Sequence, residues 1–246
     1  MKRTLVLTVG SAEKRYDLPG APSPADLADP ERRTEAETRL AAFAGPAIAL
    51  YSSAHHRLIV RGLQAVWERW GPETMDLYIL SCGYGLLAAN DQVIPYEARA
   101  AETDDAELAD RAARLHIPER GAALVRNYDL VFYLLSGWSL AALDLPLEIS
   151  GFVQQIVLTD VEGCSRVPSA PNLHPFIADG GIAAQRWHVT ADRVRGFLFE
   201  RLCTQIVHYG PGVLDWLYRR PRDVELLFYK QTRWRPQLPL WPNRRR

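Results

Sequence analysis

The strongest constraint on the fold is the alternation of short, apolar, β-prone runs with segments of helical spacing. The apolar runs cover residues 4–9, 47–50, 77–80, 130–135 and 153–158. Helical spacing is found between them, most plainly at residues 54–70, where Leu58, Leu63 and Val66 fall on one face, and again at 104–126. Strands that alternate with helices predict an α/β fold, with a mostly parallel sheet and helices on both faces.

The rest of the chain is less regular. Residues 19–34 carry four prolines and predict a loop, and Pro118 and Gly121 must break or restart the helix of 104–126. Ser136 is expected to cap a short helix that ends near Leu143. We expect an α/β core with a cleft over residues 1–160, and a loop-rich connection with a basic C-terminal region over 161–246. In that region residues 194–207 and 213–218 predict helices, and 224–229 predict a strand.

Composition excludes several classes of protein. Apolar residues make up 48% of the 246, which is enough for a sizeable core, and no run of about 18 apolar residues predicts a membrane helix. The start of the chain does not have the pattern of a signal peptide. Three cysteines far apart in the chain (Cys82, Cys164 and Cys203) predict reduced thiols and a cytoplasmic protein.

The charge is unevenly distributed although the net charge is zero. Residues 193–246 hold 12 Lys/Arg against 4 Asp/Glu, a surplus of +8, and the remainder is −8. The surplus predicts a polyanion partner, with docking of the tail on the acidic body and a solvated charged face as alternatives.

Polar residues follow several predicted strands, and this placement predicts a ligand cleft. Ser11, Lys14 and Asp17 follow the first strand, Tyr51 and Ser52 the second, and residues 81–96 the third. In parallel sheets ligands bind beyond the carboxyl ends of the strands. The stretch 81–96 combines a single acid, Asp91, with Tyr96 and with Gly83 and Gly85, which allow the backbone to approach a ligand closely. An ordinary turn whose tyrosines complete the core is the alternative.

These residues resemble the motifs of the YaaA peroxide-stress family and of small bacterial domains with the same loop. The pattern L-S-x-x-Y-G-x-L-x-x-x-D-x-x-x-P-Y is filled here by residues 80–96, including Ser81, Tyr84, Asp91 and Tyr96. The S-x-x-K-x-x-D element is filled by residues 11–17, and a strand followed by Tyr-Ser by residues 50–52. The likeness covers about the first 100 residues and implies an α/β fold and DNA binding.

The resemblance also implies a helix-hairpin-helix-like element. Gly210-Pro211-Gly212 fits such a hairpin, and Arg219, Arg220 and Arg222 lie nearby as phosphate contacts. An ordinary helix break is the alternative. In the tail, Lys230, Arg233 and Arg235 suit phosphates and Trp234 suits a base, although the tail tryptophans could instead pack on the body.

The cleft has the composition expected of a pocket for a flipped base. Tyr51, Tyr84 and Tyr96 would supply faces, and Ser11, Ser52 or Ser81 polar contacts. Cleavage of an N-glycosidic bond passes through a cationic sugar, which suits a carboxylate at Asp91 or Asp17. Lys14 could orient that carboxylate, bind a phosphate or attack the sugar as an amine. His174-Pro175 resembles the His-Pro loops of uracil-DNA-glycosylase-like folds, which implies a further site residue.

Other chemistries find little support in the sequence. His55-His56 has no partner at metal spacing, so capping or surface exposure is expected, and no metal or cofactor is predicted. The leading hypothesis is a DNA-glycosylase-type enzyme of repair or antiviral defence. The alternatives are a non-catalytic DNA-binding stress protein and an enzyme of free nucleosides or nucleotides. The sequence does not fix the oligomeric state.

Overall fold

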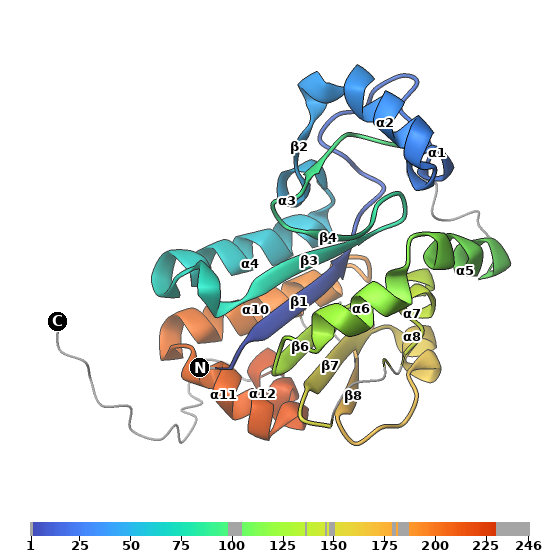
Figure 1. Cartoon of the computed structure of the whole chain (residues 1–246). Helices are drawn as coiled ribbons and strands as arrows, with labels where there is room; N and C mark the ends of the chain where they lie inside the picture. The colour runs from blue at the N-terminus through green and yellow to red at the C-terminus, as the bar shows by residue number, and fades with distance from the viewer. Residues whose placement is uncertain are drawn as a thin grey trace.

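The computed structural model describes residues 2–97, 105–135, 137–145, 147, 151–178, 181 and 187–229. Its centre is a six-stranded sheet in the order β4-β3-β1-β6-β7-β8 (Figure 1). The strands are β1 (Thr4–Val9), β3 (Asp76–Ser81), β4 (Gly85–Ala88), β6 (Leu130–Leu134), β7 (Gln154–Thr159) and β8 (Leu173–Ile177). All neighbouring pairs are parallel except β3 and β4. The predicted α/β fold with a mostly parallel sheet is confirmed.

Helices cover both faces of this sheet because successive residues of each strand point to opposite sides. Leu5, Leu7 and Tyr133 belong to a core on the side of α5 (Asp105–Arg114), α6 (Ile117–Val125) and α7 (Trp138–Leu143). Val6 and Phe132 belong to the larger core on the side of α4 (Ala54–Trp70) and α10 (Val194–Tyr209). Each face of the sheet is therefore buried.

The helices α4 and α10 lie side by side on their face of the sheet (Figure 1). Two glycines allow this contact. A Cβ on Gly196 would lie 2.6 Å from the carbonyl oxygen of His55, and one on Gly62 would lie 3.1 Å from Cys203 Sγ. These glycines let the two backbones approach more closely than side chains would allow.

The proline-rich loop predicted over residues 19–34 is wrong. The segment forms α1 (Pro24–Ala28) and the start of α2 (Pro30–Arg39). Ser23 caps α1 and Asp29 caps α2, each by accepting backbone N–H groups of the first turn. Pro24 and Pro30 are compatible with these helices because the first residue of a helix needs no N–H donor.

Two strand predictions are also wrong. Residues 47–50 form the helix α3 (Ala47–Leu50) after a two-residue strand, β2 (Gly45–Pro46), which pairs with β5 (Gln92–Val93). Residues 224–229 form the helix α12 (Val224–Tyr229). Short apolar runs do not distinguish a strand from a buried helical turn, since neither period is repeated often enough.

Regions predicted to be loops contain regular structure as well. The stretch 81–96 includes β4 and β5, and 161–190 includes α8 (Val161–Arg166) and the edge strand β8. Pro175 stands in the middle of β8, and the N–H of Leu173 at its start donates to Ala170 O at 3.2 Å. Proline occurs in sheets at such edges.

The helix of 104–126 is interrupted near Pro118 as predicted, whereas Gly121, also predicted as a break, lies within α6. His116, at φ 51°, separates α5 from α6, and Pro118 lies in the first turn of α6. The N-cap of α7 is Gly137; Ser136, predicted for this role, lies outside the described residues.

The part of the C-terminal region that the structure describes, up to residue 229, ends in three α-helices. Gly210, at φ 89°, ends α10, and α11 (Gly212–Arg219) and α12 follow. The predicted division at residue 160 stays a prediction, although β8 and α10 lie beyond it and pack against elements that precede it. No helix among the described residues is long and apolar enough to span a membrane.

Candidate functional site

The ends of β1 and β3 bring the predicted motif residues together. The N–H of Gly10 donates to Leu80 O at 2.8 Å, which holds the segment after β1 beside the end of β3. Lys14 then forms an isolated antiparallel bridge with Tyr51. Ser11, Lys14, Tyr51 and Ser81 thus meet at the carboxyl end of the sheet, where a parallel sheet places ligands.

A buried group of hydroxyls forms the base of this site. The hydroxyl of Tyr96 lies 2.9 Å from Ser81 Oγ, 3.2 Å from the hydroxyl of Tyr51 and 3.6 Å from Cys82 Sγ. Ser81 Oγ also accepts the N–H of Tyr84 at 3.1 Å. Burial raises the pKa values of Tyr51 and Tyr96, so both phenols are neutral at pH 7.

Lys14 places a partly buried amine against this group. Its Nζ lies 4.2 Å from the ring centroid of Tyr96 and 5.1 Å from that of Tyr51, and donates to Ser11 O at 2.6 Å. Burial lowers the pKa of Lys14 to about 8, against a smaller electrostatic effect of Cys82 that raises it. About a tenth of Lys14 is therefore a neutral amine at pH 7, against well under a thousandth of an ordinary lysine.

We refer to Ser11, Lys14, Tyr51, Ser81, Cys82 and Tyr96 as the amine cluster. Tyr84 lies beside it, with its ring edge-on to Tyr96 at 5.9 Å and its hydroxyl accepting the N–H of Ile94. Burial raises the pKa of Tyr84 to about 12. Gly83 is needed for space, since a Cβ there would lie 2.8 Å from Leu27 Cδ1, and Gly85 is needed for its φ of 74°.

The tyrosines are not arranged as open stacking faces. Tyr51, Tyr84 and Tyr96 are each at most 3% exposed, and their hydroxyls are engaged within the protein. The three predicted tyrosines are thus brought together around Lys14, and of the three only Tyr51 lines a cavity, which lies beside α4.

The two predicted catalytic carboxylates lie outside the amine cluster. Asp91 is exposed in the turn after β4, where it accepts the N–H of Ala88 at 2.8 Å. Ala88 pairs with Tyr78, near the start of β3, whereas Ser81 ends β3. Asp91 therefore lies near the amino end of β3, whereas Ser81 lies at its carboxyl end. Asp17 is exposed, three residues beyond Lys14.

His174 is not brought to the cluster either. It lies in β8, three strands away from β1, and its Nε2 is 3.0 Å from Gln154 Oε1. Burial and the charge of Arg222 lower its pKa. Because the His-Pro dipeptide forms part of a strand, its position differs from the loop that the resemblance implied.

Capping or surface exposure of His55 and His56 is contradicted, because both side chains are buried. His55 Nδ1 accepts the N–H of Gly196 at 3.1 Å, and its Nε2 lies 3.4 Å from Thr8 Oγ1. Burial lowers the pKa of His55 to about 3. The cap of α4 is Ser53, whose Oγ accepts the N–H of His56. His55 therefore joins α4, α10 and β1 as a neutral side chain.

The predicted DNA contacts are spread over the C-terminal helices. Gly210 and Gly212 lie at the start of α11, whereas Arg219, Arg220 and Arg222 are exposed at its other end. An eight-residue helix is about 12 Å long, so the arginines lie about that far from the hairpin. Lys230, Arg233, Trp234 and Arg235 lie outside the described residues.

Ser52 belongs to a surface that was not predicted from the sequence. With Arg15, Tyr51 and Arg57, it lines a cavity of about 470 Å³ beside α4. A second cavity of about 310 Å³ lies between α4 and α10 and shares Arg57 and Arg61 with the first. This surface could have been predicted from the spacing of Arg57 and Arg61, which are four residues apart in an amphipathic helix and so share one face of it. Cys82 was not predicted as a site residue either, although it follows the predicted Ser81 directly in the sequence.

Neither the protein-family models nor the curated proteins contain a match to this chain. The resemblance to the YaaA family therefore stays a prediction that depends on the motif residues. Among the described residues, no three His, Cys, Asp or Glu side chains are grouped as a metal site would require.

Proposed function

We propose that this protein is a DNA-acting enzyme that cleaves N-glycosidic bonds, with Lys14 as its nucleophile. The observation that carries the proposal is the partly buried amine of Lys14, with a pKa of about 8, at the carboxyl end of the sheet. Amine nucleophiles in enzymes are activated by desolvation of this kind. DNA as the substrate is supported by the motif resemblance and by the basic C-terminal region.

The chemistry follows from the amine and the rings beside it. The lone pair of Lys14 Nζ attacks C1′ of the nucleotide, the bond from C1′ to the base breaks, and the base leaves with that electron pair and takes up a proton. The nitrogen then loses a proton, and its lone pair forms a double bond to C1′ as the bond from C1′ to O4′ breaks. O4′ takes up that proton, so the products are a protonated imine and a free hydroxyl. Water hydrolyses the imine, and Lys14 is regenerated.

The tyrosine rings have a role in this scheme. A cation over an aromatic face is stabilised by about 0.5–2 kcal/mol. The rings of Tyr51 and Tyr96 lie against Nζ, so they stabilise the cationic nitrogen that forms on attack. Their phenols hold a fixed position through Ser81.

The first test is release of base from DNA that carries normal, damaged or phage-type modified bases. Free base is measured by mass spectrometry, and abasic sites by strand cleavage in alkali. Borohydride added during turnover reduces the imine to a stable secondary amine, which links the DNA to the protein. The chain has three lysines, Lys2, Lys14 and Lys230, so peptide mapping assigns the link without ambiguity.

We expect the link at Lys14, its loss in Lys14→Gln, and its retention in Lys2→Gln. Asp91→Asn is a second control, because Asp91 contacts the turn at Ala88 and not the amine. Release of base by Lys14→Gln at the wild-type rate would contradict a nucleophilic role. Binding of DNA without release from any substrate would favour the non-catalytic DNA-binding stress protein.

A further inference from the structure

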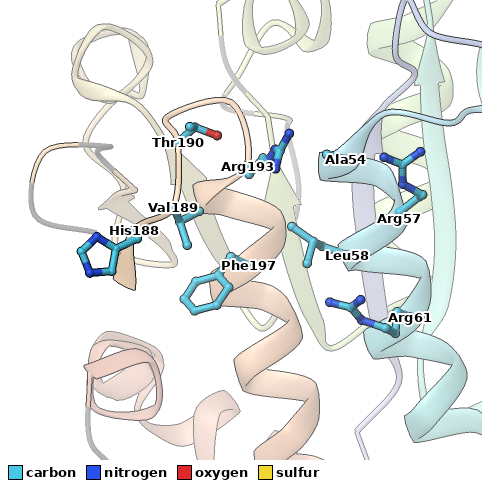
Figure 2. A pocket seen from close by; sticks show the side chains of 9 residues that line it. All are labelled: Ala54, Arg57, Leu58, Arg61, His188, Val189, Thr190, Arg193 and Phe197. Carbon is cyan, nitrogen blue, oxygen red and sulfur yellow. The ribbon is translucent and has the colours of Figure 1, made fainter. Parts of the chain in front are cut away.

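The two cavities beside α4 are linked by two arginines of that helix. Arg57 and Arg61 line both of them, Arg15 lines the larger and Arg193 the smaller. Figure 2 shows Arg57 and Arg61 on α4 and Arg193 near the start of α10, around the smaller cavity. Among the described residues, no Asp or Glu lines either cavity. We call these four residues the arginine groove.

Two of the four guanidinium groups have no ion pair within the described residues. Arg61 is paired with Glu200, and Arg193 lies 3.7 Å from Asp192. No described carboxylate lies within ion-pair distance of Arg57 or Arg15, and Arg57 donates to the carbonyl oxygen of Ser52 at 2.7 Å. The arginine groove therefore has a net positive charge and exposed donors, which suits an anionic ligand.

The shape and the apolar lining point to an extended anion that carries flat groups. Arg57 and Arg61 are one helical turn apart, about 6 Å along α4, so they can contact two separate anionic groups. Leu58, Val189 and Phe197 line the smaller cavity between the helices (Figure 2). An aromatic side chain beside cations is the usual composition of a surface that binds single-stranded nucleic acid.

The arginine groove also adjoins the segment that carries Lys14. Arg15 and Ser52 line its larger cavity, and the N–H of Ser52 donates to Glu13 O at 3.1 Å. Lys14 and Tyr51 form the bridge between these same two segments.

We propose that the arginine groove binds consecutive phosphodiesters of a single nucleic acid strand, with Arg57 and Arg61 as the central contacts. This inference rests on the proposed action on DNA and locates the strand on α4 and α10, away from the hairpin at Gly210–Gly212. It assigns the smaller cavity, with Phe197, to a base of the same strand.

The test is the affinity for a fluorescein-labelled, unmodified 12-nucleotide DNA strand, measured by fluorescence anisotropy between 50 and 200 mM salt. We expect Arg57→Gln/Arg61→Gln to weaken binding at least tenfold and to lower the slope of log K against log salt by about 1.4, which is 0.7 for each phosphate that is no longer neutralised. Arg57→Gln alone is included because it leaves the pair of Arg61 with Glu200 intact, and it should weaken binding at least threefold.

A matched control removes the same charge elsewhere. Arg69→Gln/Arg166→Gln replaces two exposed arginines outside both cavities and should leave affinity within twofold of wild type. Equal affinities of the groove and control variants would overturn the proposal. Displacement of the strand by a nucleoside 5′-monophosphate or by inorganic phosphate at a similar concentration of phosphate groups would overturn it too, because it would indicate a site for one phosphate.

Binding of the strand is measured without turnover, so the arginine groove and the glycosylase activity can be contradicted independently of each other. Base release by a wild-type enzyme whose affinity does not depend on Arg57 and Arg61 would contradict the arginine groove alone. Groove-dependent binding without base release from any substrate would contradict the glycosylase proposal alone.

Discussion

Lys14 differs from a surface lysine in where its amine lies. Its Nζ is held between the ring of Tyr96 and the carbonyl oxygen of Ser11, and burial favours the neutral form. The rings of Tyr51 and Tyr96 favour the charged form of the amine, whereas desolvation by burial is the main cause of the lowered pKa.

The lowered pKa predicts how Lys14 reacts with a general amine reagent. Acetylation by brief exposure to acetic anhydride requires the neutral amine, so labelling of Lys14 should reach half its maximum near pH 8. An ordinary lysine does so near pH 10.4. The labelling of each lysine peptide is measured by mass spectrometry from pH 6 to 11. Half-labelling of Lys14 above pH 10 would show that the amine is fully solvated.

His55 is a residue whose titration affects stability. Its pKa is about 3 in the folded protein and about 6.5 when unfolded, so the unfolded chain binds more protons between these values. Stability should therefore fall as the pH falls below 6.5, by up to about 1.4 kcal/mol for each unit.

A comparison with His55→Leu isolates this effect. The free energy of unfolding, measured in urea at pH 7 and pH 4.5, should fall by about 2–3 kcal/mol more in wild type than in the variant. Loss of the bond from Gly196 lowers the stability of the variant at both pH values and cancels in the difference. An equal fall in the free energy of unfolding of both proteins would indicate that His55 is solvated and can be protonated in the folded protein.

At the scale of elements, the contact between α4 and α10 determines how the larger core closes. Because a Cβ on Gly196 meets the backbone of His55 at 2.6 Å, Gly196→Ala should reduce the free energy of unfolding by about 1–3 kcal/mol despite the helix propensity of alanine.

Gly121→Ala in α6 is the matched control for this contact. Its nearest neighbour at 3.0 Å is the flexible end of Leu143, so the change in unfolding free energy should stay within about 1 kcal/mol. Thermal melting of both variants compares them, and equal destabilisation would show that the helices adjust freely.

For the whole molecule, the basic C-terminal region predicts the dependence of DNA affinity on salt. Residues 230–246 carry six Lys/Arg and no acid. Deletion of these residues should weaken binding to a single strand and reduce the salt slope, by about 0.7 for each phosphate that the tail neutralises. Anisotropy titrations of the full-length and shortened chains measure this. An unchanged slope would indicate that the tail does not contact phosphate.

The sequence predicted the strands of the sheet centre because each is a continuous apolar run, as strands buried on both faces must be. It missed α1 and α2, where prolines stand in first turns, and β8, where His174 and Pro175 interrupt the apolar pattern. For the site, motif order grouped Lys14 with Tyr51, Ser81 and Tyr96. It did not exclude Asp91, because the reversal of the chain at β4 is not visible in the spacing.

Pro175 limits how far the sheet can extend beyond β8. Alternate residues of a strand direct their N–H groups to opposite neighbours, and Ala178 donates to Thr159 of β7, so the nitrogen of Pro175 faces the open edge. That nitrogen has no hydrogen, and the N–H of Leu173 is engaged with Ala170. A foreign strand laid along β8 therefore finds a donor only at Ile177 among these three positions. Pro175, together with the engaged N–H of Leu173, therefore protects this edge against edge-to-edge aggregation.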